Sequence, residues 1–430
     1  MSQTITIKPH VALEQRLNRF PQGAPPSETL YRILGILFSE REASLVARLP
    51  VKPFTAKKAA SIWNMPYNEA LQVLEGLADR CLLVDMEVNG DKQYILPPPM
   101  AGFFEFSMMR LRTDIDQKLL GELFYQYMNV EEDFIRQLFL STETRLGRVF
   151  VNEEVLPADP ALEILDFERA TNVIKTATHI GIGTCYCRHK MQHVGKNCDA
   201  PMDICMTFNN VASSLTRHGY ARQVEASECT EILHQAYEAN LVQFGENIQK
   251  GVSFICNCCG CCCEGLVAAR KFGSLRPVAT SSFVPELNAD SCTGCGKCAR
   301  VCPVEAISMV PVSDSKKKLP EVDESICLGC GVCARACPTQ ALSLKKHGRK
   351  IITPVNSVHK TVLIAIERGM LQELIFDNKA LFSHRAMAAI LGAILKMPPV
   401  KQIMASRQMK SVYLVRLIER MSKPAIVTTG

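Results

Sequence analysis

A cysteine pattern that occurs twice, at an offset of 35 residues, constrains this chain more than any other feature. The segments CTGCGKCARVCPVEAIS (292–308) and CLGCGVCARACPTQALS (327–343) both read C-x2-C-x2-C-x3-C-P. Three thiolates on such a loop reach three irons of one cubane, whereas the fourth, just before a proline, points toward a second cluster. The pattern therefore predicts two interleaved ligand sets: Cys292, Cys295, Cys298 and Cys337 for the first cluster, and Cys327, Cys330, Cys333 and Cys302 for the second.

The two segments resemble the bacterial-type ferredoxins with two 4Fe–4S clusters, over about residues 286–344. The resemblance implies a compact, pseudo-symmetric unit of short hairpins and helices that transfers single electrons. Structural zinc is the competing interpretation, but zinc sites pair two C-x2-C knuckles and need no C-P repeat. Diffusible ferredoxins of this kind are acidic, whereas residues 288–344 hold six acidic and six basic residues. We therefore expect an internal relay rather than a free carrier.

Cysteines are concentrated in the middle of the chain, where 19 of the 20 lie between Cys185 and Cys337. The remaining one, Cys81, ends an apolar helical pattern and is predicted to be a packed core thiol. The first residues lack an export signal, which favours a cytoplasmic protein whose cysteines bind metal rather than form disulfides. The longest apolar run, Ala386–Leu395, has ten residues, too few to span a bilayer.

A second cysteine field precedes the ferredoxin repeat and consists of two pieces. The first supplies four thiolates, a full ligand set for a third cubane: Cys185, Cys187, Cys198 and Cys205. The second supplies six, more than the four irons of one cubane use: Cys256, Cys258, Cys259, Cys261, Cys262 and Cys263. Either an unusual further centre draws on both pieces, or some thiols are open for redox chemistry.

Zinc competes for this upstream field, with His189 or His193 as an alternative ligand. Arg188 and His189 can offset the negative charge of a cluster or hydrogen-bond to its sulfurs. The field resembles cysteine-rich segments that precede ferredoxin domains in multi-cluster proteins of anaerobes. The resemblance implies at least one additional iron–sulfur centre, without assigning individual ligands.

The residue pattern of the N-terminal part predicts three helices, over Glu28–Ala47, Thr55–Trp63 and Asn68–Arg80. Two strands joined through Asn89–Gly90 are predicted to follow them. This order resembles a winged helix–turn–helix domain over residues 27–97. The helix in the recognition position carries three acidic residues against Arg80 alone, which opposes the phosphate contacts that DNA binding requires. We therefore expect protein docking here rather than DNA binding. The aromatic and methionine residues of 103–129 are predicted to pack into the core or against a partner, with a cofactor pocket as the alternative.

The C-terminal part is basic, with 15 Lys and Arg against 4 Asp and Glu over residues 345–430. Amphipathic helices are predicted at 358–375, 383–397 and 401–421. Such helices suit the inner face of an anionic membrane, an acidic partner or a solvated bundle, and these alternatives stay open. Neither G-x-G-x-x-G after a strand nor G-x4-G-K-[ST] occurs, so no nucleotide or flavin site of those types is indicated.

The predicted fold is a multidomain α+β protein with a cysteine-rich α/β middle. Its predicted parts are an N-terminal extension (1–26), a winged-helix-like domain (27–97), a helical connector (98–180), a cysteine-rich domain (181–285), a dicluster ferredoxin domain (286–344) and a basic helical region (345–430).

The leading functional hypothesis is an iron–sulfur electron-transfer protein of an anaerobic system. It would relay single electrons to or from a partner oxidoreductase or electron-carrier protein. One alternative is an oxidoreductase whose own substrate or disulfide-reducing site lies in the cysteine-rich domain. A second is a redox-sensing transcriptional regulator that uses the winged helix.

Overall fold

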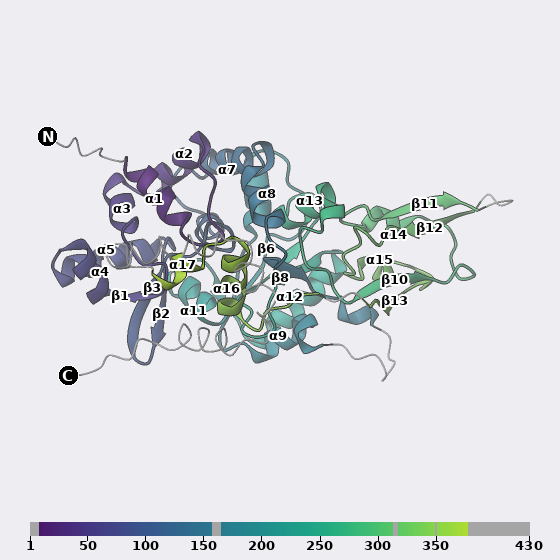
Figure 1. The fold of residues 1–430 in the computed structure, drawn as a ribbon. Helices are drawn as coiled ribbons and strands as arrows, with labels where there is room; N and C mark the ends of the chain where they lie inside the picture. The colour runs from purple at the N-terminus through teal and green to yellow at the C-terminus, as the bar shows by residue number, and fades with distance from the viewer. Residues whose placement is uncertain (1–7, 157–164, 313–316, 349–350, 377–430) are drawn as a thin grey trace.

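The computed structural model describes residues 8–156, 165–312, 317–348 and 351–376 (Figure 1). Helices and several small sheets alternate along an elongated molecule, which agrees with the predicted α+β class. The N-terminal helices form one end, and the hairpins of the ferredoxin repeat form the other (Figure 1). No helix within the described ranges is long and apolar enough to cross a membrane. The predicted helices 383–397 and 401–421 lie outside the described residues.

Short helices and a small sheet build the N-terminal end. The helices are α1 (Pro9–Leu17), α2 (Glu28–Leu37), α3 (Glu40–Val46), α4 (Ala56–Trp63) and α5 (Tyr67–Asp79). The strands β1 (Phe54–Thr55), β2 (Val84–Val88) and β3 (Asp91–Ile95) form a sheet in the order β1-β3-β2. Asn89 and Gly90 both take positive φ, as the predicted two-residue hairpin turn requires.

The single helix predicted over Glu28–Ala47 is two helices. Phe38 is extended, and Ser39 begins α3 with a capping box in which its side chain and that of Glu42 each bond the other's backbone N–H. The S-x-x-E pattern that marks such a helix start is present in the sequence. The apolar residues nevertheless continue at helical spacing on both sides of it, and this periodicity predicts one unbroken helix. Cys81 is buried, as predicted for a core thiol.

The aromatic segment that follows packs into the core, which is one of the alternatives predicted for it. It contains a non-helical turn at Pro99–Phe103, a π-helical turn at Gln126–Val130, and the helices α6 (Phe104–Phe106), α7 (Gln117–Tyr125) and α8 (Asp133–Leu140). Phe104 lies at the centre of this cluster, with the rings of Phe103, Phe124 and Phe134 within 4.9–6.0 Å of its own, centroid to centroid. This cluster joins the N-terminal helices to the middle of the molecule.

A six-stranded sheet forms the middle, in the order β4-β8-β9-β6-β5-β7. Its strands are β4 (Gly147–Val149), β5 (Ile180–Thr184), β6 (Asp203–Phe208), β7 (Arg222–Gln223), β8 (Val242–Glu246) and β9 (Phe254–Cys258). All of its strand pairs are antiparallel, so the α/β arrangement predicted for this region is wrong. Helices do follow strands here, but none acts as a crossover between parallel neighbours.

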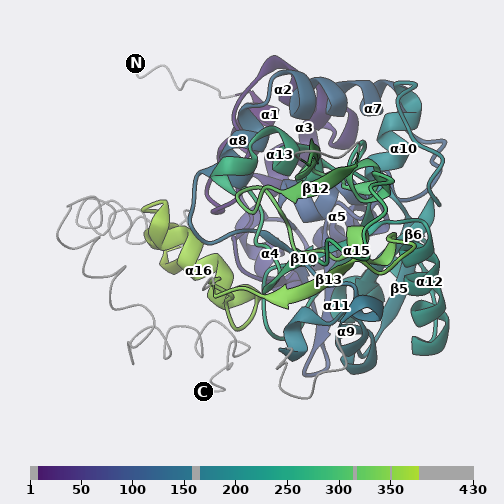
Figure 2. The same ribbon diagram turned by 90° about the vertical axis from the view of Figure 1, so that its right-hand side faces the viewer.

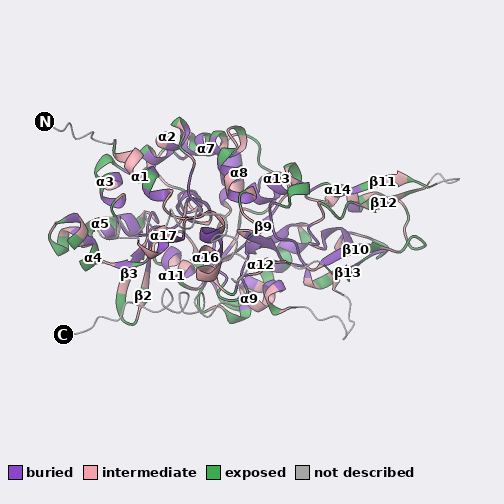
Figure 3. Ribbon diagram, viewed as in Figure 1, coloured by how far each residue is buried: buried purple, intermediate pink, exposed green. Residues whose placement is uncertain are grey.

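Five helices pack around this sheet. They are α9 (Ala170–Thr176), α10 (Tyr186–His193), α11 (Asn209–Arg217), α12 (Ala226–Glu238) and α13 (Glu264–Lys271). The helices α9 and α12 share an apolar core with β5 and β6, and buried residues line the sheet (Figure 3). The helix α11 contacts β2 and so links the sheet to the N-terminal end.

The ferredoxin end consists of two hairpins and two short helices, and Figure 2 looks onto it. The strand β10 (Phe283–Leu287) pairs with β13 (Leu342–Lys346), and β11 (Ile307–Pro311) pairs with β12 (Lys318–Val322). The helices α14 (Lys297–Val301) and α15 (Val332–Arg335) follow the two cysteine loops. Short 3-10 turns occur at Glu153–Val155, Asp166–Glu168 and Gly273–Leu275.

The predicted helix 358–375 is also broken, into α16 (Ser357–Glu367) and α17 (Leu371–Ile375). Gly369 has a φ of 65° at the junction, a left-handed conformation that ends α16. Lys360 of α16 donates a 2.6 Å hydrogen bond to the buried carboxylate of Glu246 in β8. This buried ion pair fixes α16 against the central sheet.

Candidate metal and cluster sites

The eight cysteines of the ferredoxin repeat surround two small cavities of about 20 Å³ each. Each cavity takes three cysteines from one repeat and the fourth from the other. The first is lined by Cys292, Cys295, Cys298 and Cys337, and the second by Cys302, Cys327, Cys330 and Cys333. Four converging thiols around an enclosed space are a donor set that fits a 4Fe–4S cluster.

The backbone of these loops turns closely around the sulfurs. The amides of Gly294 and Ala306 donate to the Sγ atoms of Cys292 and Cys302, at 3.4 and 3.2 Å. Gly329 has a φ of 68°, and a Cβ there would lie 2.1 Å from the carbonyl oxygen of Phe283. Only glycine fits this position, so the second loop sits directly on β10.

In the upstream field, strand alternation brings three cysteines to one face of the central sheet. Successive side chains of a strand point to opposite faces. Ile204 and Met206 of β6 therefore join the apolar core beneath α12, whereas Cys205 between them faces the other side. Cys256 and Cys258 of β9 lie on the same side as Cys205, because Ile255, which directly precedes Cys256, joins that core and Cys256 and Cys258 therefore face away from it.

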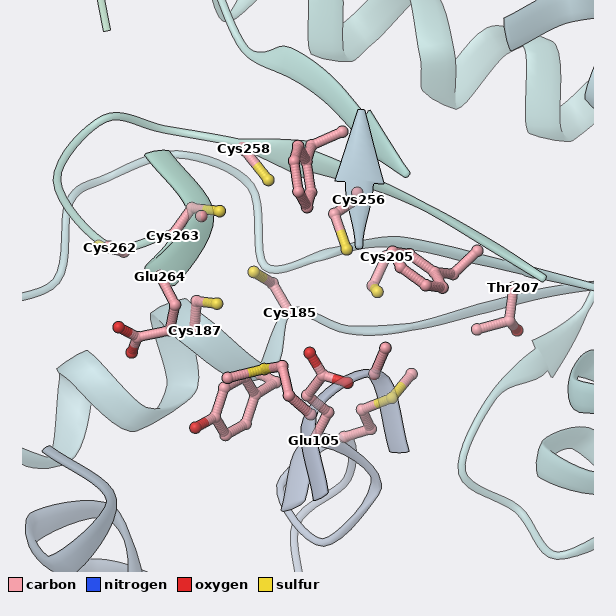
Figure 4. Close-up of a pocket in the computed structure, with 18 of the residues that line it drawn as sticks. Glu105, Cys185, Cys187, Cys205, Thr207, Cys256, Cys258, Cys262, Cys263 and Glu264 are labelled. Atoms are coloured by element: carbon pink, nitrogen blue, oxygen red, sulfur yellow. The ribbon is translucent and has the colours of Figure 1, made fainter. Parts of the chain in front are cut away.

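Two helix starts bring three more cysteines over this face. Cys185 precedes α10 and Cys187 lies in its first turn, while Cys263 precedes α13. A helix N-terminus stabilises negative charge, including that of a thiolate. Figure 4 shows the six side chains directed into one space, and we refer to them as the six-cysteine set: Cys185, Cys187, Cys205, Cys256, Cys258 and Cys263.

The six-cysteine set lines a cavity of about 90 Å³. Apolar side chains such as Met109 and Phe244 line much of the remaining wall, and Glu105 enters from α6 (Figure 4). Desolvation raises the pKa of the Glu105 carboxyl to about 8, although the Gly102 N–H, 2.9 Å away, opposes the rise. Burial likewise raises the pKa of the Cys185 thiol to about 12. The chain thus surrounds these thiols with a medium of low polarity.

Two buried cations lie beside the cavity. Arg188 is 1% exposed and donates to the carbonyl oxygens of Pro201 and Asn257, at 2.8 and 2.7 Å, while its Nε has no partner. Lys190 is fully buried and pairs with Glu264, which also accepts a hydrogen bond from Asn129 at 3.0 Å. A buried charge is costly unless compensated, so Arg188 fits a site that carries anionic thiolates.

A second, tighter group of thiols lies at the edge of the same cavity. The sulfurs of Cys198, Cys259, Cys261 and Cys262 all lie within 4.8 Å of one another, and we refer to them as the four-cysteine group. His189 and His193, the alternative ligands from the sequence, are not in it. Their Nε2 atoms lie 3.2 Å from each other, and Nδ1 of His189 lies 2.7 Å from the Met108 carbonyl oxygen.

The structure groups the upstream cysteines differently from their order in the chain. Cys198 joins the second piece, and Cys185, Cys187 and Cys205 join three cysteines of that same piece. Three polar residues of the site, Glu105, Lys190 and Glu264, were not predicted from the sequence. Glu264 directly follows the cysteine run, and this adjacency is the one sequence signal that pointed to it.

The upstream field contacts the ferredoxin end at Gly260. Gly260 lies in the loop between Cys259 and Cys261, and a Cβ on it would lie 2.2 Å from the carbonyl oxygen of Pro303. Pro303 follows Cys302 and lines the second ferredoxin cavity with it. The backbone of the upstream loop therefore packs directly on the backbone of a cluster-binding loop.

Comparison with known proteins agrees with the ferredoxin end. Residues 291–341 match the family described as 4Fe-4S dicluster domain. Searches among curated proteins and among solved structures gave no match. The match indicates that this part of the chain binds 4Fe–4S clusters and takes part in iron–sulfur electron transfer.

Proposed function

We propose that this protein relays single electrons between two ferredoxin-type clusters and a third iron–sulfur centre in the six-cysteine cavity, to or from a partner oxidoreductase. The clusters, when bound, accept and return one electron at a time. The chain supplies thiolate ligands, backbone N–H groups directed at sulfur and a largely apolar enclosure, and these features set the reduction potential.

The contact between Gly260 and Pro303 carries the proposal. It puts a loop of the upstream field against the residue next to Cys302, so the two metal-binding regions share a backbone interface. The neutral charge of the ferredoxin end also supports an internal relay rather than a free carrier. We propose that this interface is the electron path between the third centre and the dicluster end.

For the third centre, the six-cysteine set offers two thiols more than a cubane uses. Arg188 would compensate the negative charge of the bound thiolates, and the ion pair of Lys190 with Glu264 would hold α10 against α13. Because Cys187 lies in α10 and Cys263 directly precedes α13, the ion pair keeps both thiols aimed at one space. The chain thus holds the centre rigidly, which suits electron transfer.

We propose that the N-terminal end docks a protein partner. The acidic side chains of α5 are engaged within the chain: Glu69 pairs with Arg41 at 2.6 Å, and Glu75 pairs with Lys92 at 2.7 Å. The charged side chains of α5 are thus acidic and paired within the chain. The helix has no surplus of cationic side chains, which a DNA-binding helix needs to contact phosphates. The basic residues of 345–430, most of which lie outside the described residues, are a second candidate for binding an acidic partner or an anionic membrane.

Rapid-freeze EPR of the anaerobic full chain tests the relay. A one-electron donor that reduces the dicluster end should deliver electrons onward to a third paramagnetic centre, at a rate independent of protein concentration. The Cys258→Ser variant should keep the ferredoxin signals and lose the third one. Electrons that stay on the two ferredoxin clusters in the wild-type chain would contradict the proposal.

A second candidate function is a substrate-reducing site in the same cavity. Glu105 favours it, because a carboxyl with a raised pKa beside redox-active thiols can supply a proton to a reduced substrate. This candidate predicts turnover of a small molecule or disulfide without a partner protein. It also predicts that Glu105→Gln abolishes turnover while one-electron transfer continues. Absence of any turnover would exclude the substrate-reducing site and leave the electron relay as the proposed function.

A further inference from the structure

The four-cysteine group has the dimensions of a site for a single metal ion. The Sγ atoms of Cys198 and Cys259 lie 3.6 Å apart, as do those of Cys261 and Cys262, and Cys198 and Cys262 lie 4.0 Å apart. A tetrahedral ion with bonds of about 2.3 Å to sulfur places its ligands about 3.8 Å from one another. The observed separations agree with this value.

A cubane requires a wider arrangement, because its four thiolates bind four different irons with the body of the cube between them. The ferredoxin cysteines provide the internal comparison. Among the described residues, no three cysteines of either ferredoxin set, and no three of the six-cysteine set, lie within 4.8 Å of one another. The four-cysteine group therefore differs in kind from the sets that suit a cluster.

We propose that Cys198, Cys259, Cys261 and Cys262 bind one zinc ion as a closed tetrathiolate site, separate from the clusters. Four thiolates and no open position are typical of structural zinc. Four thiolates around one divalent ion leave a net negative charge. The buried guanidinium of Arg188, which donates to the carbonyl oxygen of Pro201 in the segment that carries Cys198, would compensate that charge.

The ion would have a structural task at the junction with the dicluster end. Cys259 and Cys261 flank Gly260, so a metal bound to both fixes the loop that packs on Pro303. Cys198 comes from the segment between α10 and β6, so the same ion ties that segment to the loop. We therefore expect loss of zinc to loosen the proposed electron path without removing the clusters.

Metal analysis of the anaerobic full chain, with its iron sites fully reconstituted, tests this site. We expect about one zinc per chain, with an X-ray absorption spectrum that shows four sulfur neighbours at about 2.3 Å and no second metal. Cys261→Ser changes the exposed ligand and should lower zinc at least fivefold while the ferredoxin EPR signals persist. Cys261→His should restore zinc, since histidine is also a zinc ligand.

Cys229→Ala is the matched control, because this buried thiol of α12 lies in the opposite apolar core and should leave zinc unchanged. Three outcomes would overturn the proposal: mononuclear iron at the site, a further cubane bound by these four cysteines, or no zinc in the reconstituted chain. A missing zinc with three iron–sulfur centres present would leave the relay intact. Zinc present with only the ferredoxin clusters would instead contradict the relay.

Discussion

Gly260 and Pro303 are in backbone contact, although one belongs to the upstream cysteine field and the other to the ferredoxin repeat. A side chain at position 260 has no room, because its Cβ would lie 2.2 Å from the Pro303 carbonyl oxygen. This contact joins the upstream cysteine field to the ferredoxin end. In our account it is the path along which electrons move between them.

The Gly260→Ala variant tests that path. The loop must shift away from Pro303, and overpacking of this kind costs about 1–3 kcal/mol in the free energy of unfolding. We expect unchanged iron content but at least a tenfold slower electron transfer between the third centre and the dicluster end, measured by rapid-freeze EPR. Gly76→Ala, in the exposed face of α5 with nothing within 4 Å of its Cβ, is the control. Equal rates in both variants would refute the path.

Interleaved ligation predicts which cysteine variants behave alike. The EPR spectrum of Cys302→Ser should resemble that of Cys330→Ser, since both cysteines line the second cavity. It should differ from that of Cys298→Ser, although Cys298 is the preceding cysteine in the chain, because Cys298 lines the first cavity. EPR of each reduced variant should show loss or change of one cluster only. If Cys302→Ser and Cys298→Ser instead removed the same signal, the ligand sets would not be interleaved.

Arg188 is predicted to tune the third centre through its charge. Replacement by Met removes a buried cation and two hydrogen bonds to backbone carbonyls, which should destabilise the fold by about 3 kcal/mol. Loss of positive charge also disfavours the reduced, more negative state, so the midpoint potential of the third centre should fall. The potentials of the ferredoxin clusters should stay constant. The control is Arg41→Met, an exposed arginine of α3 at the N-terminal end. It should change none of these potentials in a redox titration.

The junction between β2 and α11 should make stability depend on pH. Asp85 accepts hydrogen bonds from Ser214 at 2.6 Å and from His218 at 3.2 Å. The bond to Asp85 raises the pKa of His218 above 6.5, despite its burial. Burial opposes ionisation of Asp85, but its hydrogen bonds outweigh that effect and lower its pKa below 3.8.

A group with a raised pKa stabilises the fold fully below its unfolded value and loses that contribution as the pH rises through its folded value. His218 should therefore stabilise the junction at pH 6 and lose that effect toward pH 8. Asp85 should lose its own contribution as the pH falls below about 3.8. In chemical unfolding, the wild-type free energy of unfolding should decline between pH 6 and 8. The His218→Gln variant should lack this decline, whereas the exposed His234→Gln variant should retain it. A wild-type curve that is flat over this interval would contradict the assignment.

Features set by local sequence could be predicted. The Asn89–Gly90 turn formed where two φ-positive residues stand between alternating strands, and Cys81 is buried where the apolar helical pattern ends. The helix break at Ser39 was missed, although its capping motif is local, because an unbroken apolar stripe masked it. Local signals thus suffice when they do not conflict with one another.

Features set by tertiary packing could not be predicted. Cys198 joins Cys259 because the chain between them returns through four strands and two helices, and nothing in the spacing of these cysteines encodes that return. The role of Gly260 depends on Pro303, which is distant in the sequence. The antiparallel order of the central sheet was missed for the same reason, because register and neighbours arise only on folding.

The most direct test of the whole account is the amount of iron and sulfide per chain in anaerobically purified protein, combined with EPR of the reduced state. Two ferredoxin clusters and a third cubane-sized centre predict about twelve irons, with a matching amount of sulfide and three interacting signals. About eight irons with two signals would contradict the third centre. Colourless protein, or zinc in place of iron at the C-P loops, would contradict the account as a whole.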